Sequence, residues 1–145
     1  MVQQRLGYRM VFNHFGQVRQ SVRQEVGLAV DRTCKAIEAS AKAKVMDPPK
    51  TGRIYRRGNV EHQASAPGEA PATDTGDLAG SITSRMRGPL SGEVNVGAED
   101  GPYLEYGTVK TDRLAPRPFL GPSVEEEKPN FEREMAAAIR RGAGG

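Results

Sequence analysis

The chain has little of what most enzymes and disulfide-rich domains carry. Its 145 residues include one cysteine, two histidines and no tryptophan, and aromatic residues make up 6%. The single Cys34 excludes an internal disulfide. No histidine, cysteine or carboxylate cluster has the spacing of metal ligands, and the sequence has neither a phosphate-binding Gly-Lys-Ser/Thr loop nor a Gly-x-Ser-x-Gly elbow. We therefore expect no enzymatic activity, no cofactor and no bound metal.

Long apolar runs are also absent. No stretch approaches the ~18 consecutive apolar residues of a membrane span, and the first ten residues lack the apolar core of a signal peptide. We expect no membrane partner and synthesis in a cytoplasm. Hydrophobic content is 37% and mean hydropathy is −0.60, which suits either a subunit that completes its burial against partners or a loop-rich monomer. A net charge of +3 and a pI near 9.2 suit an acidic partner or nearby nucleic acid.

Two runs dense in proline and glycine dominate the second half of the chain. They are ASAPGEAPATDTGDLAGSI, from Ala64 to Ile82, and PYLEYGTVKTDRLAPRPFLGPSV, from Pro102 to Val124. Proline fixes φ and glycine allows positive φ, so such runs specify one backbone path. A disordered linker would not contain so many aromatic and aliphatic residues. The runs therefore predict shaped loops, which are more typical of a part that fits against neighbours than of an enzyme.

Hydrophobic periodicity predicts an α+β fold. We expect one domain, 1–145, with a small and mostly antiparallel sheet packed by one long N-terminal helix and a C-terminal helix. Residues 47–75 form a long connection, extended or hairpin-like, of the kind that contacts a partner. In the first half of the chain the expected elements are a strand at Leu6–Phe12, a helix at Gln17–Met46 and a hairpin of Ile54–Arg57 with Val60–Gln63. In the second half they are a tight turn or single helical turn at Thr75–Ala79, strands at Ser81–Arg87 and Glu93–Gly97, a helical turn at Pro102–Gly107 and an extended Arg117–Leu120. The last helix is expected to begin at the Ser123–Glu126 capping box or at Pro129.

The long connection carries the first group of candidate site residues. Arg53, Arg56 and Arg57 surround Tyr55. Basic side chains around an aromatic ring are typical of nucleic-acid contacts. A solvated hairpin accounts for the same residues equally well, so both interpretations stay open.

The second proline- and glycine-rich run carries the second group, which we interpret as subunit-interface candidates: Tyr103, Leu104, Glu105, Tyr106, Arg117 and Phe119. Glu105 has no partner base in the sequence, which favours a surface or interface carboxylate over a catalytic acid. The two tyrosines are expected to pack at a core edge with their hydroxyls outward rather than to stack on bases.

The stretch SAPGEAPATDTGDLAGSI, the later YLEYGT and the following RPFL, in this order and spacing, resemble the tail-completion or head–tail joining (neck) protein family of long-tailed phages, which is tail-terminator-like. The resemblance covers roughly Val11 to Arg141. It implies a structural virion protein, assembled in the host cytoplasm, that forms a ring at the head–tail junction or tail end. The implied partners are further copies of the chain, most simply in a hexamer, together with the tail tube protein, head-completion or connector proteins, and DNA in the channel. A basic nucleic-acid-binding module is the alternative function.

Overall fold

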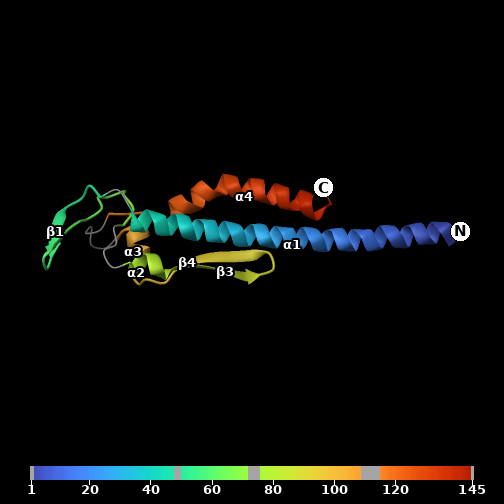
Figure 1. Cartoon of the computed structure of the whole chain (residues 1–145), viewed down its shortest axis with the longest axis horizontal. Helices are drawn as coiled ribbons and strands as arrows, with labels where there is room; N and C mark the ends of the chain where they lie inside the picture. The colour runs from blue at the N-terminus through green and yellow to red at the C-terminus, as the bar shows by residue number, and fades with distance from the viewer. Residues whose placement is uncertain (1, 48–49, 72–75, 109–114, 145) are drawn as a thin grey trace.

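The chain folds around one very long helix, with two hairpins and three further helices placed along it (Figure 1). The computed structural model describes residues 2–47, 50–71, 76–108 and 115–144, with side chains described from residue 16 onward. The predicted α+β class is confirmed. In chain order the elements are α1 (Val2–Met46), β1 (Ile54–Arg57), β2 (Val60–Gln63), α2 (Asp77–Ser81), β3 (Ile82–Gly88), β4 (Ser91–Val96), α3 (Gly101–Tyr106) and α4 (Leu120–Gly142).

The arrangement is elongated. Helix α4 packs along one side of α1, and the β3–β4 hairpin lies along the other side (Figure 1). The short helices α2 and α3 and the β1–β2 hairpin gather at the end where α1 finishes, and the N-terminal part of α1 extends beyond the ends of α4 and of the β3–β4 hairpin. None of the helices in the described part of the chain is long and apolar enough to span a membrane.

Helix α1 corrects one prediction and confirms another. The strand predicted at Leu6–Phe12 is wrong, because these residues belong to α1, which begins at Val2 rather than near Gln17. Strand propensity is a weak preference that depends on a partner strand, whereas adding residues to an existing helix needs no new nucleation. The C-terminal end at Met46 is as predicted, just before Pro48-Pro49 in the sequence. Ala41 and Val45, which lie one helical turn apart on α1, are fully buried.

The two long helices approach closely at the C-terminal end of α4. A Cβ added at Gly142 would lie 2.4 Å from the Cα of Val22, so glycine is required for this approach. Ion pairs flank the seam, with Arg141 Nε 3.0 Å from Glu25 and Lys44 Nζ 2.6 Å from Glu126. These pairs are partly exposed, so each contributes little stability compared with the packing.

The start of α4 differs from both predicted starts. The helix begins at Leu120, and Ser123 donates its hydroxyl to the Phe119 carbonyl at 2.8 Å instead of capping a later turn. Pro129 lies inside the helix, at an exposed position. Arg117 and Pro118 lie outside any regular element, but Leu120 is helical, so the predicted extended segment is only partly right. An acceptor from another element caps this helix, as described below.

The β3–β4 hairpin confirms the predicted alternation. Ile82 is fully buried and Ser84 and Met86 are half-buried on the face toward α1, whereas the intervening side chains are exposed. The pairing is antiparallel, with Ile82 opposite Val96. The strands of the described residues form two separate two-stranded sheets rather than one small sheet. The hydrophobic core lies where the C-terminal part of α1 meets α2, the start of β3 and the residue before α4, and consists of Ala41, Val45, Leu78, Ala79, Ile82 and Phe119.

Candidate functional site: the β1–β2 hairpin and the α3–α4 junction

The two sequence motifs YLEYGT and RPFL contact each other directly. The Arg117 N–H donates to the Leu104 carbonyl at 2.7 Å. The Glu105 carboxylate accepts the N–H groups of Phe119 at 2.9 Å, Leu120 at 3.0 Å and Gly121 at 2.8 Å. We call this contact the α3–α4 junction. It places the C-terminal half of α3 against the N-terminus of α4.

Glu105 therefore caps a helix whose first N–H groups lie 14 to 16 residues later in the chain. The first N–H groups of a helix have no partner within it, and the positive end of the helix dipole favours an anion there. One carboxylate meets both requirements at α4. Its role within the subunit is structural, which sequence reasoning missed because nothing near Glu105 in the sequence indicates its donors.

The other subunit-interface candidates in these two motifs fall into two sets, with side chains that face the core and side chains that face solvent. Phe119 is 1% exposed in the core, and Leu104 packs against that core. Tyr103 is 56% and Tyr106 is 77% exposed. The predicted placement of these tyrosines at a core edge is wrong, because α3 turns Leu104 inward and the i, i+3 pair of tyrosines then shares the opposite face.

The loop before α2 makes hydrogen bonds both to the base of the β1–β2 hairpin and to the chain just before the α3–α4 junction. The Glu69 carboxylate accepts the N–H groups of Thr51 at 3.1 Å and Ala66 at 2.8 Å, and also the Thr51 hydroxyl. These bonds, the Thr51 hydroxyl first, hold the pKa of Glu69 below its usual value. The Gly68 N–H donates to the Pro116 carbonyl at 3.0 Å. The chain segments that enter and leave the hairpin are thus fixed to the body.

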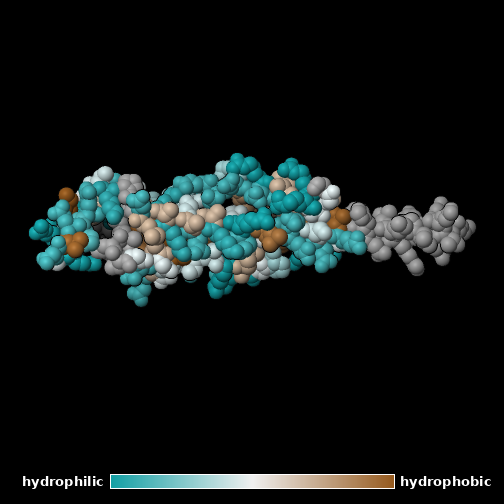
Figure 2. All heavy atoms as spheres, viewed as in Figure 1, coloured by the Kyte–Doolittle hydropathy of each residue, from teal (hydrophilic) through white to brown (hydrophobic). Residues whose placement is uncertain are grey.

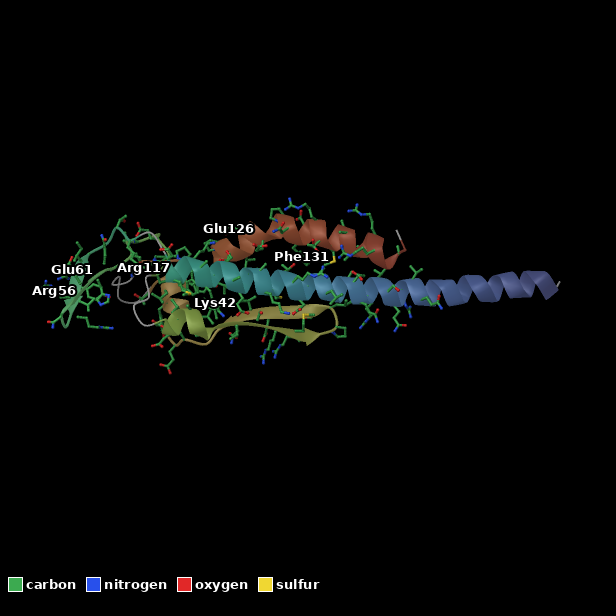
Figure 3. The ribbon with its side chains drawn as sticks, viewed as in Figure 1. Lys42, Arg56, Glu61, Arg117, Glu126 and Phe131 are labelled. Atoms are coloured by element: carbon green, nitrogen blue, oxygen red, sulfur yellow. The ribbon has the colours of Figure 1, made fainter. Side chains whose placement is uncertain are left out.

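Arg117 lies at the same junction (Figure 3). Its backbone N–H is used by Leu104, and its positive charge lowers the pKa of Glu69 as a minor contribution. Its Nε is buried and has no hydrogen-bond partner among the described residues. Arg117 is half-buried, so it is less available to a neighbouring subunit than an exposed arginine.

The predicted hairpin of the long connection is confirmed. Strands β1 and β2 pair antiparallel, with Arg56 opposite Glu61 and Tyr55 opposite His62. The Tyr55 and His62 rings stack with centroids 5.5 Å apart. Gly58, at φ 65°, provides the left-handed turn residue that a two-residue hairpin loop needs.

The hairpin stands clear of the body, and Arg56 and Glu61 lie at its outer end (Figure 3). All four residues of β1 are exposed, and in β2 only His62 is half-buried. Ile54 and Val60 are 57% and 58% exposed. Figure 2 shows hydrophobic side chains on this otherwise hydrophilic end of the molecule. At the hairpin base the Gly52 N–H donates to the Ala64 carbonyl at 2.9 Å, and the Ala64 N–H donates to Arg53 at 3.0 Å.

Metal coordination and thiol chemistry have little support among the described residues. They contain no group of three histidine, cysteine or carboxylate side chains that could hold a metal ion. Burial first, and Asp31 second, raise the pKa of the Cys34 thiol, which makes it a poor nucleophile. A groove of ≈750 Å³ between α1 and the β3–β4 turn is lined by Arg23, Leu28 and Met86 among others, without converging catalytic groups.

Comparison with protein-family models, curated proteins and solved structures finds no match for this chain. A functional interpretation therefore depends on the sequence motifs and on the geometry described above.

Proposed function

We propose that the chain is a structural subunit of a phage virion that assembles with copies of itself into a hexameric ring at the head–tail junction or at the tail end. In this role it completes the tail or joins it to the head. It acts by burying surface against neighbours, with no reaction of its own. Its other partners are the tail tube protein and the head-completion or connector proteins.

One observation carries the proposal. Exposed apolar side chains gather on two small pieces at one end of the molecule, Ile54 and Val60 on the hairpin and Tyr103 and Tyr106 on α3. Single exposed apolar residues are normal on a protein surface, but grouped ones at projecting elements are typical of interaction sites. A two-stranded hairpin is also marginally stable without a covering partner. Both features favour a subunit over a self-sufficient monomer.

The contact between the motifs adds support. The resemblance to the neck family rests on the order and spacing of YLEYGT and RPFL, and in this chain these segments meet through Glu105 and the start of α4. The spacing of the two motifs thus has a structural reason. The contact between the motifs holds the backbone of α3, which carries the exposed Tyr103 and Tyr106 on the surface where a neighbour can contact them.

A basic nucleic-acid-binding module is the second candidate function. The stacked rings of Tyr55 and His62 share one face of the hairpin with the exposed Arg57, a combination that suits stacking on bases and pairing with phosphates. Binding of this kind weakens steeply with salt because counterions are released. Strong salt-dependent DNA binding by a protein that never self-associates would favour this function over the structural one.

The structural function is tested by electron microscopy of lysates from a phage in which the reading frame of this protein is disrupted. We expect filled heads and assembled tails that do not join, or tails of abnormal length. Supplying the intact chain in trans is the control, and it should restore joined particles. Normal infectious particles without the protein would refute the proposal.

A further inference from the structure

The β1–β2 hairpin has two open faces. Cross-strand pairs share a face, so Ile54, Arg56, Glu61 and Gln63 lie on one face and Tyr55, Arg57, Val60 and His62 on the other. Each face carries one aliphatic side chain that is more than half exposed. Burial of such side chains against a partner would stabilise the hairpin, which packs neither face on the body of its own chain.

The hairpin is basic. Between Lys50 and Ala64 there are four lysine or arginine side chains and one carboxylate, for a net charge of +3 with His62 neutral. Arg53 and Arg56 are exposed. A partner surface that receives the hairpin should therefore present carboxylates around an apolar or aromatic centre.

The surface around α3 has this composition. We define the α3 surface by its exposed residues Glu99, Asp100, Pro102, Tyr103 and Tyr106. No lysine or arginine occurs between Gly97 and Thr108. Arginine guanidinium groups pair with carboxylates and also stack on tyrosine rings, so each kind of exposed side chain on the hairpin has a counterpart on this surface.

We propose that the hairpin of one copy docks on the α3 surface of a second copy. The inference rests on the proposed function, because it names the two surfaces through which the ring closes. Different surfaces of each copy then meet head to tail, which is the kind of contact that generates rings. Docking on the α3 surface of the same chain is disfavoured, since in the folded subunit the hairpin stands clear of the body and its strands are almost entirely exposed (Figure 1).

Cysteine cross-linking between two differently tagged full-length variants tests the contact. One variant carries Val60→Cys and the other Tyr103→Cys, and the native Cys34 is buried and stays in both. Under mild oxidation at high protein concentration, we expect the mixed pair to cross-link several-fold more than either variant alone. A mixture of Val60→Cys with Ile139→Cys is the control, since Ile139 is exposed but lies toward the far end of α4.

Charge reversal tests the electrostatic part. Arg53→Glu with Arg56→Glu should reduce the mixed cross-link several-fold, and so should Glu99→Lys with Asp100→Lys. Asp100 makes no side-chain cap to α3, so its replacement leaves that helix intact. Combining the reversed hairpin in one variant with the reversed α3 surface in the other should restore the cross-link. Restoration is an outcome that misfolding cannot produce.

The outcomes separate this inference from the proposed function. Rings seen in virions without the mixed cross-link, in solution or in particles, would refute the hairpin contact and leave the ring intact. If the hairpin variants lost only salt-dependent DNA binding, the hairpin would be a nucleic-acid contact, and the inferred contact between copies would be refuted. Absence of the protein from virions, together with a monomer at all concentrations, would refute both.

Discussion

Replacement of Glu105 by alanine should destabilise the fold although the residue lies outside the core. The substitution removes the carboxylate that accepts the N–H groups of Phe119, Leu120 and Gly121. These donors stand at the start of α4, where no other acceptor within the helix can replace it. The helix also loses the negative charge next to the positive end of its dipole.

The size of the effect follows from two contributions. Loss of an N-terminal cap costs about 1 kcal/mol, and loss of an anion at a partly buried helix N-terminus costs about 1 kcal/mol more. We therefore expect the free energy of unfolding to fall by about 2 kcal/mol. For a domain of this size that corresponds to a decrease in Tm of roughly 6–8 °C. Glu105→Gln keeps an acceptor oxygen but not the charge, so it should cost about half as much.

Thermal and urea unfolding followed by circular dichroism measure this loss. The matched control is Glu132→Ala, an exposed carboxylate on α4 itself, whose removal should change the unfolding free energy by less than about 0.5 kcal/mol. If Glu105→Ala were as stable as Glu132→Ala, the capping argument would be wrong. The α3–α4 junction would then depend on Leu104 and Phe119 alone.

Two further predictions concern α1. Gly16→Ala should raise the free energy of unfolding in urea by up to about 1 kcal/mol, because alanine favours the helix and its Cβ meets nothing within 4 Å. Gly27→Ala should lower it, because that Cβ would lie 2.5 Å from a backbone carbonyl of the β3–β4 turn. Equal effects of the two substitutions would contradict this difference in packing. Hydrogen bonds from Lys42 first, and from Ser84 second, hold the pKa of Glu38 below its usual value. The ionised Glu38 carboxylate therefore stabilises the fold at neutral pH, and this stabilisation is lost as pH falls through the lowered pKa. Glu38→Gln should therefore be less stable than the unaltered protein at neutral pH and equally stable in acid, and a pH-independent difference in unfolding free energy would exclude this linkage.

Much of the fold could be predicted because its signals are local. The three- and four-residue steps of α1, the alternation of Ile82, Ser84 and Met86, and the Gly58-Asn59 turn each reflect a rule that acts over a few residues. The prediction of a strand at Leu6–Phe12 is wrong for the same reason, because it is based on local signals alone. Its aromatic and β-branched residues favour a strand locally, whereas the helix on its C-terminal side continues through it.

The candidate site could be predicted only in part, because its key contacts join distant segments. The exposed arginines of the hairpin follow from the sequence, and so does the α3 turn. The pairing of Glu105 with the start of α4 does not, since it depends on how α3 and α4 pack. The exposure of Tyr103 and Tyr106 depends on the same packing, because it is decided by which face of α3 meets the core.

The six-residue motif YLEYGT therefore combines residues that stabilise the subunit with residues that are exposed on its surface. Leu104 and Glu105 hold the subunit together, one by packing on the core and the other by capping α4, while Tyr103 and Tyr106 face away from it. Because the inward residues are held by the core and by three hydrogen bonds, the backbone that carries the outward tyrosines is already ordered, and only their side-chain rotamers lose freedom when a neighbour binds. In the proposed ring each copy would meet two neighbours, so contacts that are weak one by one would reinforce each other as the ring closes.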